Sequence, residues 1–341
     1  MKKSITLLLL VLLAVGLWTP GCSKSSNDSN AGGGAGSSVS FPEGPIELKI
    51  KWPVGNRYVQ RIDLQQHSDM KLPQRPEPMK QDVTMGLEYA IAVMGENGAK
   101  GRELEMEFVA AEMDIVMGNR SIMNFDSGGE TLDGAVNPLA SLFDNMIGHK
   151  VRLFTNDDQD VERVEGLEEL TRNIMKDAPP QSRGMMTNMF GRDIFKQMVE
   201  LSKGMPDRPV QPGDTWNSTM EISMGAMGDM VMSVDYTFLD WQMKHDRACA
   251  HLEFSGTFSS GSENAIGPMG MTMSLEKGTA AGESWIDPEL GMTVGGLVNQ
   301  HMAMKMTAEI PKIGDKGGGT QVIDMVLNQV INTKLVNVET P

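Results

Sequence analysis

Cys22 has the clearest chemistry in this sequence, because its surroundings suit the attachment of a membrane lipid. Two lysines precede an apolar run at residues 5–18 that is too short to span a bilayer comfortably, and Pro20-Gly21 leads into the cysteine. This is the plan of a bacterial lipoprotein signal. We therefore expect cleavage before Cys22, acylation of this residue, and a mature chain that is tethered to a membrane outside the cytoplasm.

The residues beside Cys22 leave one alternative open. Lipoprotein signals usually place Leu three residues before the cysteine and small residues at the next two positions, whereas this chain has Thr19, Pro20 and Gly21. An ordinary secretory signal with an incidental cysteine is the alternative. The Ser-, Asn- and Gly-rich residues 23–40 favour the lipoprotein, because a lipid anchor needs a flexible tether. Ser23 is not the Asp that favours retention in an inner membrane, so we expect the periplasmic face of the outer membrane.

Methionine is the second residue type with possible chemistry, since 30 methionines accompany only ten phenylalanines and three tyrosines. Thioethers bind the soft ion Cu(I), and they also form apolar linings that adapt to the shape of a ligand. Alternate residues of any strand share a face, and His301 should project to the face opposite its methionine neighbours. We therefore expect an apolar cavity or core and no metal site. The candidate cavity-lining residues are Met232, Met271, Met273, Met302, Met304 and Met306.

Two other motifs are similar to functional sites but lack the residues that the chemistry needs. Residues 126–129, Asp-Ser-Gly-Gly, are similar to the nucleophile segment of trypsin-like proteases, but His67 is the only mature-chain histidine upstream and lies in an ordinary polar strand end. Asp157, Asp158 and Asp160 lack the Gly and the spaced bidentate Glu of an EF-hand loop. We expect a protein that is not an enzyme and uses no cofactor.

Charge and cysteine content limit the partners further. The mature chain has 28 basic against 45 acidic residues, a formal charge of −17, which makes nucleic acid and anionic lipid surfaces poor partners. Cys249 is the only other cysteine, so no intramolecular disulfide can form once Cys22 is acylated. We expect Cys249 to be a buried, small apolar residue rather than a reactive thiol.

Strands are the main elements that position these residues, because apolar and polar residues alternate along much of the chain. A change of phase at Ala110-Ala111 predicts a bulge. Helices are expected from Pro138 to Gly148, and at about 167–176 and 182–203, with a hairpin at 150–164. The predicted strands cover residues 46–52, 83–93, 104–117, 230–238, 252–258, 269–275 and 302–310.

The two β-rich parts resemble each other in the order of their motifs. A turn at Gly55 precedes an aromatic residue, as does a turn at Gly213, and Tyr89 matches Tyr236 at a spacing of 147 residues. We predict an α+β, β-dominated fold of duplicated, strongly curved antiparallel sheets of the open half-barrel type, with a central helical segment. The expected divisions are a signal peptide at 1–21, a flexible tether at 22–43, a first β unit at 44–136, a helical segment with a hairpin at 137–205 and a second β unit at 206–341.

Three motifs carry a resemblance to a known family. They are the Gly-Asn-Arg-Tyr turn at 55–58, the helix and Gly-His-Lys hairpin at 139–166, and the Pro-Gly-Asp-Thr-Trp turn at 212–216. With the leader, they resemble an uncharacterised family of bacterial envelope lipoproteins, a domain of unknown function with a Gly-Asp-x-Trp turn. The resemblance covers most of residues 44–310. It implies a periplasmic or cell-surface β protein and brings no catalytic residues.

Three functional hypotheses follow from these features. The first is a non-enzymatic lipoprotein that binds an apolar ligand or lipid in a methionine-lined cavity. The second is a structural or protein-interaction module of the cell envelope, in which the methionines form a closed core. The third is a Cu(I) carrier. A continuous apolar cavity of about 300 Å³ or more would favour the first hypothesis, and a filled core would favour the second.

The membrane anchor gives a direct prediction. Replacement of Cys22 by serine removes the thiol that the lipid would modify, so the Cys22→Ser variant should move from the membrane fraction to the soluble fraction. Fractionation of cells with an antibody against the chain measures this change. Equal solubility of the variant and the wild type, or a mature N-terminus without lipid in mass spectrometry, would contradict the prediction.

Overall fold

The computed structural model of the chain describes residues 41–73, 75–98, 100–129, 141, 143–176, 191–199, 204–223, 229–260, 271–310 and 319–340. The described part is mostly β, with two short helices, α2 (Leu167–Ile174) and α4 (Arg192–Val199). The strands of the described part are β1 (Arg57–Lys71), β2 (Met79–Asn97), β3 (Gly101–Met117), β4 (Arg120–Asp126), β5 (Lys150–Thr155), β6 (Val161–Glu165), β7 (Thr215–Ser223), β8 (Asp229–Lys244), β9 (Arg247–Ser260), β10 (Met271–Asp287), β11 (Met292–Ile310) and β12 (Gly319–Glu339).

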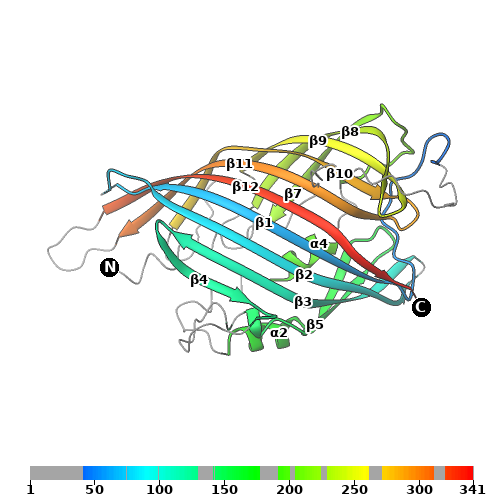
Figure 1. The fold of residues 1–341 in the computed structure, drawn as a ribbon, viewed down its shortest axis with the longest axis horizontal. Helices are drawn as coiled ribbons and strands as arrows, with labels where there is room; N and C mark the ends of the chain where they lie inside the picture. The colour runs from blue at the N-terminus through cyan, green and yellow to red at the C-terminus, as the bar shows by residue number, and fades with distance from the viewer. Residues whose placement is uncertain are drawn as a thin grey trace, which may run out of the picture.

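All twelve strands belong to one antiparallel sheet (Figure 1). The order is β6-β5-β3-β2-β1-β12-β11-β10-β9-β8-β7, and β4 pairs with β3 beside this path. The last strand, β12, lies between β1 and β11 and so joins the first half of the chain to the second. The sheet is open, and it is neither closed nor strongly curled. The predicted β-dominated, antiparallel fold is confirmed, but the expected strong curvature of the half-barrel type is wrong. The two β parts form one sheet because β12 hydrogen-bonds to both of them.

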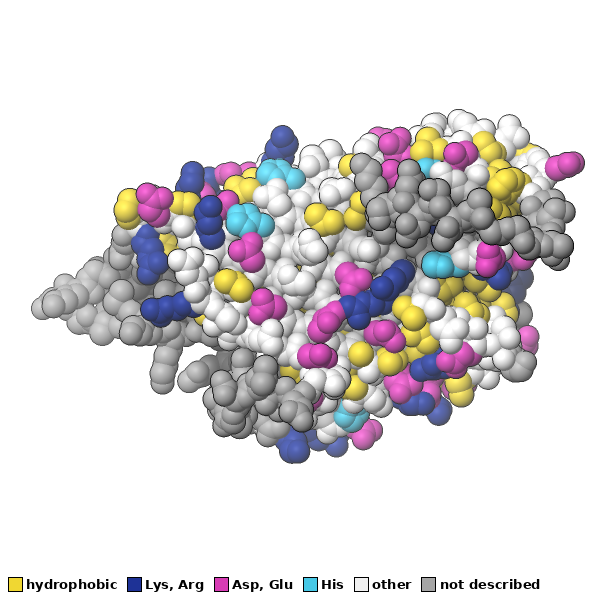
Figure 2. All heavy atoms as spheres, in the orientation of Figure 1, with side chains coloured by type: hydrophobic (Ala, Val, Ile, Leu, Met, Phe, Trp, Pro, Cys, Tyr) yellow, Lys and Arg dark blue, Asp and Glu magenta, His cyan; other side chains and the backbone are white. Residues whose placement is uncertain are grey.

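One face of the sheet carries most of the buried side chains, and we call it the inner face. Along β1, Ile62, Leu64 and Met70 are buried in one alternating phase, and the residues of the opposite phase face the other side. Both helices contribute to the apolar cluster on the inner face of β1 to β5, which also holds the side chains of Leu170, Ile174, Phe195, Met198 and Val199. The opposite, outer face is polar, and Figure 2 shows acidic and basic side chains interspersed over the strands that face the viewer.

The two predicted turns are equivalent in their hydrogen bonding. The amide of Gly55 donates to the carbonyl of Val93 at 2.8 Å, and the amide of Gly213 donates to the carbonyl of Phe238 at 2.7 Å. In both turns the amide of the partner strand donates back, at 2.9 Å, to the residue that follows the glycine. Both glycines have positive φ, 93° and 95°. The matched order of turn and strand in the two β parts is thus present in the structure.

The predicted match of Tyr89 with Tyr236 is wrong by two residues, which is one step along the same face of the strand. Tyr58 lies opposite Ile91, and Trp216, at the same distance from its turn, lies opposite Tyr236. Tyr236 therefore corresponds to Ile91 rather than to Tyr89, although both tyrosines lie in the strand that pairs with the strand after the turn, which is β2 for Tyr89 and β8 for Tyr236. The hydrogen bonds of the turns set this register, and the identity of the aromatic residues does not.

Other local predictions had mixed outcomes. Residues 46–52 form no strand beyond a bridge between Ile46 and Val210, although Leu48, Ile50 and Trp52 are buried as the alternation predicted. The predicted bulge is present, since Glu88 pairs with Ala110 and Tyr89 with Phe108. The hairpin at 150–164 and the helix at about 167–176 are confirmed as β5, β6 and α2. Much of the predicted helices from Pro138 and at 182–203 lies outside the described residues.

The positive φ of the two turn glycines predicts a cost for adding a side chain there. Gly213→Ala should lower the free energy of unfolding by about 1–2 kcal/mol, because a Cβ disfavours the left-handed region. Gly95→Ala is the matched control, since Gly95 has ordinary φ and nothing lies within 4 Å of an added Cβ. Its effect should stay within about 0.5 kcal/mol. Urea unfolding of the variants measures both changes, and equal effects would contradict the prediction.

Candidate functional site

The predicted methionines lie on the inner face of the second half of the sheet. Met302, Met304 and Met306 follow one another along β11, Met232 lies on β8, and all four are 0–6 % exposed. The backbone of Met271 and Met273 begins β10, but their side chains lie outside the described ones. The buried set, which we call the methionine cluster, comprises Met70, Met220, Met230, Met232, Met302, Met304, Met306 and Met325.

Four methionines stand side by side across neighbouring strands. Met304 on β11 lies opposite Met325 on β12, Met325 lies opposite Met70 on β1, and Met70 lies opposite Met79 on β2. Side chains that are directly opposite on adjacent strands are close enough to interact. The inner face therefore carries a transverse row of thioethers, which the alternation within single strands did not reveal.

A second transverse row is made of glutamines. Gln300 on β11 lies opposite Gln329 on β12, and Gln329 lies opposite Gln66 on β1. All three are buried, with 1–4 % of their surface exposed. Ser68 on β1 lies opposite Gln81 on β2, and both are fully buried. Ser68 is the next inner-face residue after Gln66 along β1, in the direction of the methionine row. We call these five residues the glutamine cluster.

Hydrogen bonds satisfy only part of this cluster. The side-chain nitrogen of Gln329 donates to Oε1 of Gln66 at 2.7 Å, and Nε2 of Gln66 donates to the hydroxyl of Ser68 at 3.2 Å. Within the described part of the chain, Oε1 of Gln329, Oε1 of Gln300 and both amide atoms of Gln81 are buried without a partner. Each such atom costs about 1–3 kcal/mol unless something bonds to it. A native fold that keeps several of them together needs an explanation.

Along β1 and β12, the glutamine cluster lies between two apolar regions. Leu64 and Ile331 flank it on one side and belong to the cluster that the helices cover. Met70 and Met325 flank it on the other side and belong to the methionine cluster. A molecule on this face would therefore meet neutral amides between two apolar surfaces.

Buried charge is compensated elsewhere in the fold, at the turn after β10. Asp287 is buried, forms an ion pair with Arg247, and accepts hydrogen bonds from the amides of Glu289 and Leu290 at 2.8 and 3.1 Å. The glutamine cluster has no counterpart of this arrangement, and among the described residues the buried acidic and histidine side chains are Asp287 and His251, both with polar partners. Both belong to the end of the sheet that lies away from Gln300.

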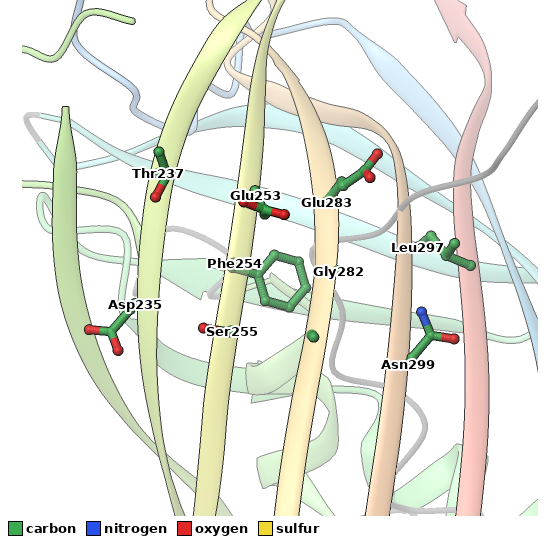
Figure 3. A pocket seen from close by; sticks show the side chains of 10 residues that line it. Asp235, Thr237, Glu253, Phe254, Ser255, Gly282, Glu283, Leu297 and Asn299 are labelled. Carbon is green, nitrogen blue, oxygen red and sulfur yellow. The ribbon is translucent and has the colours of Figure 1, made fainter. Parts of the chain in front are cut away.

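A hollow of about 410 Å³ lies on the outer face of β8 to β11 (Figure 3). Asn299 lines it, whereas the next residue, Gln300, is buried on the inner face. Glu253 and Glu283 lie directly opposite each other in it. None of its lining residues is a methionine, so this hollow does not provide the apolar cavity that the sequence predicted. The residues that line the hollow are Asp235, Thr237, Glu253, Phe254, Ser255, Ala281, Gly282, Glu283, Leu297 and Asn299.

The structure gives the remaining motif residues local roles. The hydroxyl of Ser127 accepts a hydrogen bond from the amide of Ala111 at 2.9 Å, and Asp157 accepts one from the amide of Lys100 at 2.8 Å. His301 points away from the methionines, as expected, and bonds to Asn328 at 2.8 Å. In the described ranges no three His, Cys, Asp or Glu side chains converge to hold a metal ion.

Sequence patterns missed the glutamine cluster, although a signal for it was present. Leu64, Gln66, Ser68 and Met70 alternate in one phase, so the two polar residues should share the face of the two apolar ones. A polar residue in the buried phase of a strand predicts a hydrogen-bonded or ligand-contacting position. The polar residues around His67 are typical of an ordinary strand end, and the sequence pattern does not predict β12, the strand that supplies Gln329.

A family model matches residues 100–293, more than half of the chain. The chain belongs to a family of unknown function (DUF6263). The residues matched to DUF6263 begin before β3 and end at the start of β11, so Cys22 and all five residues of the glutamine cluster lie outside them. No curated protein shows significant similarity to the chain. No helix in the described part is both long and apolar enough to cross a bilayer.

Three solved structures illustrate the distant similarity of this DUF6263 member to known folds. Lipovitellin shares 12 % identity over 85 % of this chain and 26 % of its own, with a TM-score of 0.41. OccK5 (OpdH) of Pseudomonas aeruginosa shares 6 % identity over 84 % and 98 %, with a TM-score of 0.20. A putative outer membrane lipoprotein-sorting protein domain of Vibrio parahaemolyticus shares 9 % identity over 86 % and 87 %, with a TM-score of 0.13. This chain thus spans about a quarter of lipovitellin.

Cys249 is buried as predicted, and burial, with a smaller contribution from the nearby Asp287 carboxylate, raises the pKa of its thiol to about 12. The folded state therefore keeps a proton that an unfolded thiol loses near pH 8.5. The contribution of this thiol to the free energy of unfolding is therefore fully present below about pH 8.5, and it is lost as the pH rises toward 12.

We predict that Cys249 does not react with a thiol reagent at pH 8 in the folded Cys22→Ser variant, in which it is the single cysteine. The same chain in denaturant should react with one equivalent, because the thiol then ionises normally. Absorbance of the released reagent measures both reactions. Rapid labelling of the folded variant would show that the thiol is accessible.

Proposed function

We propose that this chain is an extracytoplasmic lipoprotein, anchored through Cys22, that binds a lipid or a similar amphipathic ligand on the inner face of its sheet. The observation that carries the proposal is the set of buried, unpartnered amide atoms of the glutamine cluster beside a row of methionines. An acyl chain on the methionines and a polar group at the glutamines would complement both surfaces. The supporting features are all on one face of one sheet.

Methionine suits such a ligand because its side chain is unbranched and rotates about three bonds. The methionine cluster is buried, so ligand entry requires its side chains to rearrange. Burial of about ten methylenes of a chain gains about 8 kcal/mol, at about 0.8 kcal/mol each. This gain is comparable with the several kcal/mol that association costs in lost freedom. The hydrogen bonds at the glutamines would add affinity and fix where the chain ends.

Two observations favour the alternative, a structural or protein-interaction module. The methionines are packed as in a filled core. On the outer face, Val322, Val326 and Val330 of β12 are 36–40 % exposed, which leaves apolar contacts for a partner. The transverse methionine row keeps the Cu(I) carrier as a third possibility, because adjacent thioethers could bind one ion.

Ligand titration of the purified Cys22→Ser chain tests the proposal. A fluorescent acyl ester should bind saturably, and unlabelled lipid extracted from the source membrane should displace it. Met304→Leu should keep this binding within about threefold, because leucine preserves apolar volume. Met94→Leu is the control, since Met94 is exposed on β2.

Titration with Cu(I) separates the remaining cases. Binding of about one Cu(I) that Met304→Leu abolishes and Met94→Leu does not would overturn the lipid proposal in favour of a copper carrier. No binding of either the ester or Cu(I) would overturn both and favour the interaction module. Competition between the two ligands in the wild type identifies a shared site.

A further inference from the structure

We propose that the glutamine cluster selects lipids whose polar group is uncharged, such as an acylglycerol, over lipids that end in a carboxylate. This inference rests on the proposed function and specifies its ligand class. It starts from the chemistry of the unpartnered atoms within this cluster, which are amide oxygens or nitrogens of Gln81, Gln300 and Gln329.

The geometry of these atoms suits a ligand with more than one hydrogen-bonding group. Gln300 and Gln329 are directly opposite on adjacent strands, so their free oxygens start from backbones about 4.8 Å apart. Two neighbouring hydroxyls of a glycerol group could donate to them. Gln81 offers both a donor and an acceptor, and can bond to a hydroxyl or to an ester carbonyl.

Reversal of the amide network does not change the class of ligand. If Gln66 and Gln329 both turned their amides over, a free nitrogen of Gln329 would replace the free oxygen, since Gln66 bonds to both Gln329 and Ser68. A free amide N–H complements an ester carbonyl, and a free oxygen complements a hydroxyl. An acylglycerol has both groups.

The charge of the surroundings argues against an anionic headgroup. The buried positions that flank the glutamine row are uncharged on both sides. They are Leu64, Ile331 and Val298 on one side, and Ser68, Leu327 and Met302 on the side of the methionine row. Ser68 is the single polar member and is neutral. A carboxylate that is buried without a cation loses several kcal/mol of hydration. At Asp287, by contrast, the fold supplies an arginine and two backbone amides.

Gln300 is the residue to change in a test, because its side-chain oxygen has no partner to lose among the described residues. Gln300→Leu keeps the size of the side chain and removes the polar group. Asn299→Leu is the matched control on the same strand, since Asn299 faces the outer hollow. The thermal unfolding midpoint of each variant confirms that it is folded.

The experiment compares monooleoylglycerol with oleate at pH 8, where oleate is ionised, as competitors for the fluorescent acyl ester on the Cys22→Ser chain. We expect the acylglycerol to bind at least tenfold more tightly than oleate. Gln300→Leu should weaken acylglycerol binding about tenfold and leave oleate binding unchanged, whereas Asn299→Leu should change neither.

The possible failures are distinguishable. Equal or tighter binding of oleate, with the ester still bound, overturns the charge selectivity and leaves lipid binding intact. Acylglycerol binding that Gln300→Leu does not weaken shows that the amides are satisfied by water rather than by ligand, and this overturns the inference as well. Failure of all three lipids to bind overturns the proposed function itself.

Discussion

The pairing of β12 with β1 on one side and β11 on the other is the interaction on which the rest of the structure depends. The paired residues run from Arg57 opposite Glu339 to Lys71 opposite Asp324 on one edge, and from Gly295 opposite Lys334 to Ile310 opposite Gly319 on the other. Without this strand, the first and second halves of the chain would each end in an unpaired edge. With it, twelve strands form one sheet with a single inner face.

The arrangement of side chains in rows on the inner face results from the pairing of β12 with β1 and β11. Residues from β1, β11 and β12 fall into transverse rows, so that glutamine stands beside glutamine and methionine beside methionine. The apolar rows lower the free energy of the folded state by burial, at about 25 cal/mol for each Å² removed from water. The glutamine row opposes this gain, because amides without partners are costly in an apolar setting. The proposed ligand would remove that cost by bonding to them.

The two faces of the sheet divide the functional possibilities. The outer face carries interspersed charges and a polar hollow, and its ion pairs are mostly exposed and individually weak. The inner face carries neutral amides and thioethers, which suit an uncharged amphipathic molecule. Membership of DUF6263 adds no activity to this picture, because the family is described only as one of unknown function.

The sequence by itself determined the features that depend on neighbours along the chain. Alternation with a period of two placed Met302, Met304 and Met306 on one face and His301 on the other, and glycines of positive φ marked the equivalent turns. The sequence also predicts a lipoprotein leader that ends before Cys22, and both the leader and the acylation of this cysteine stay predictions. Tertiary structure alone decided which strands are neighbours, and therefore the match of Tyr236 with Ile91 and the glutamine row. The physical reason is that register arises from hydrogen bonds between distant segments, which leave no periodic signal in either strand.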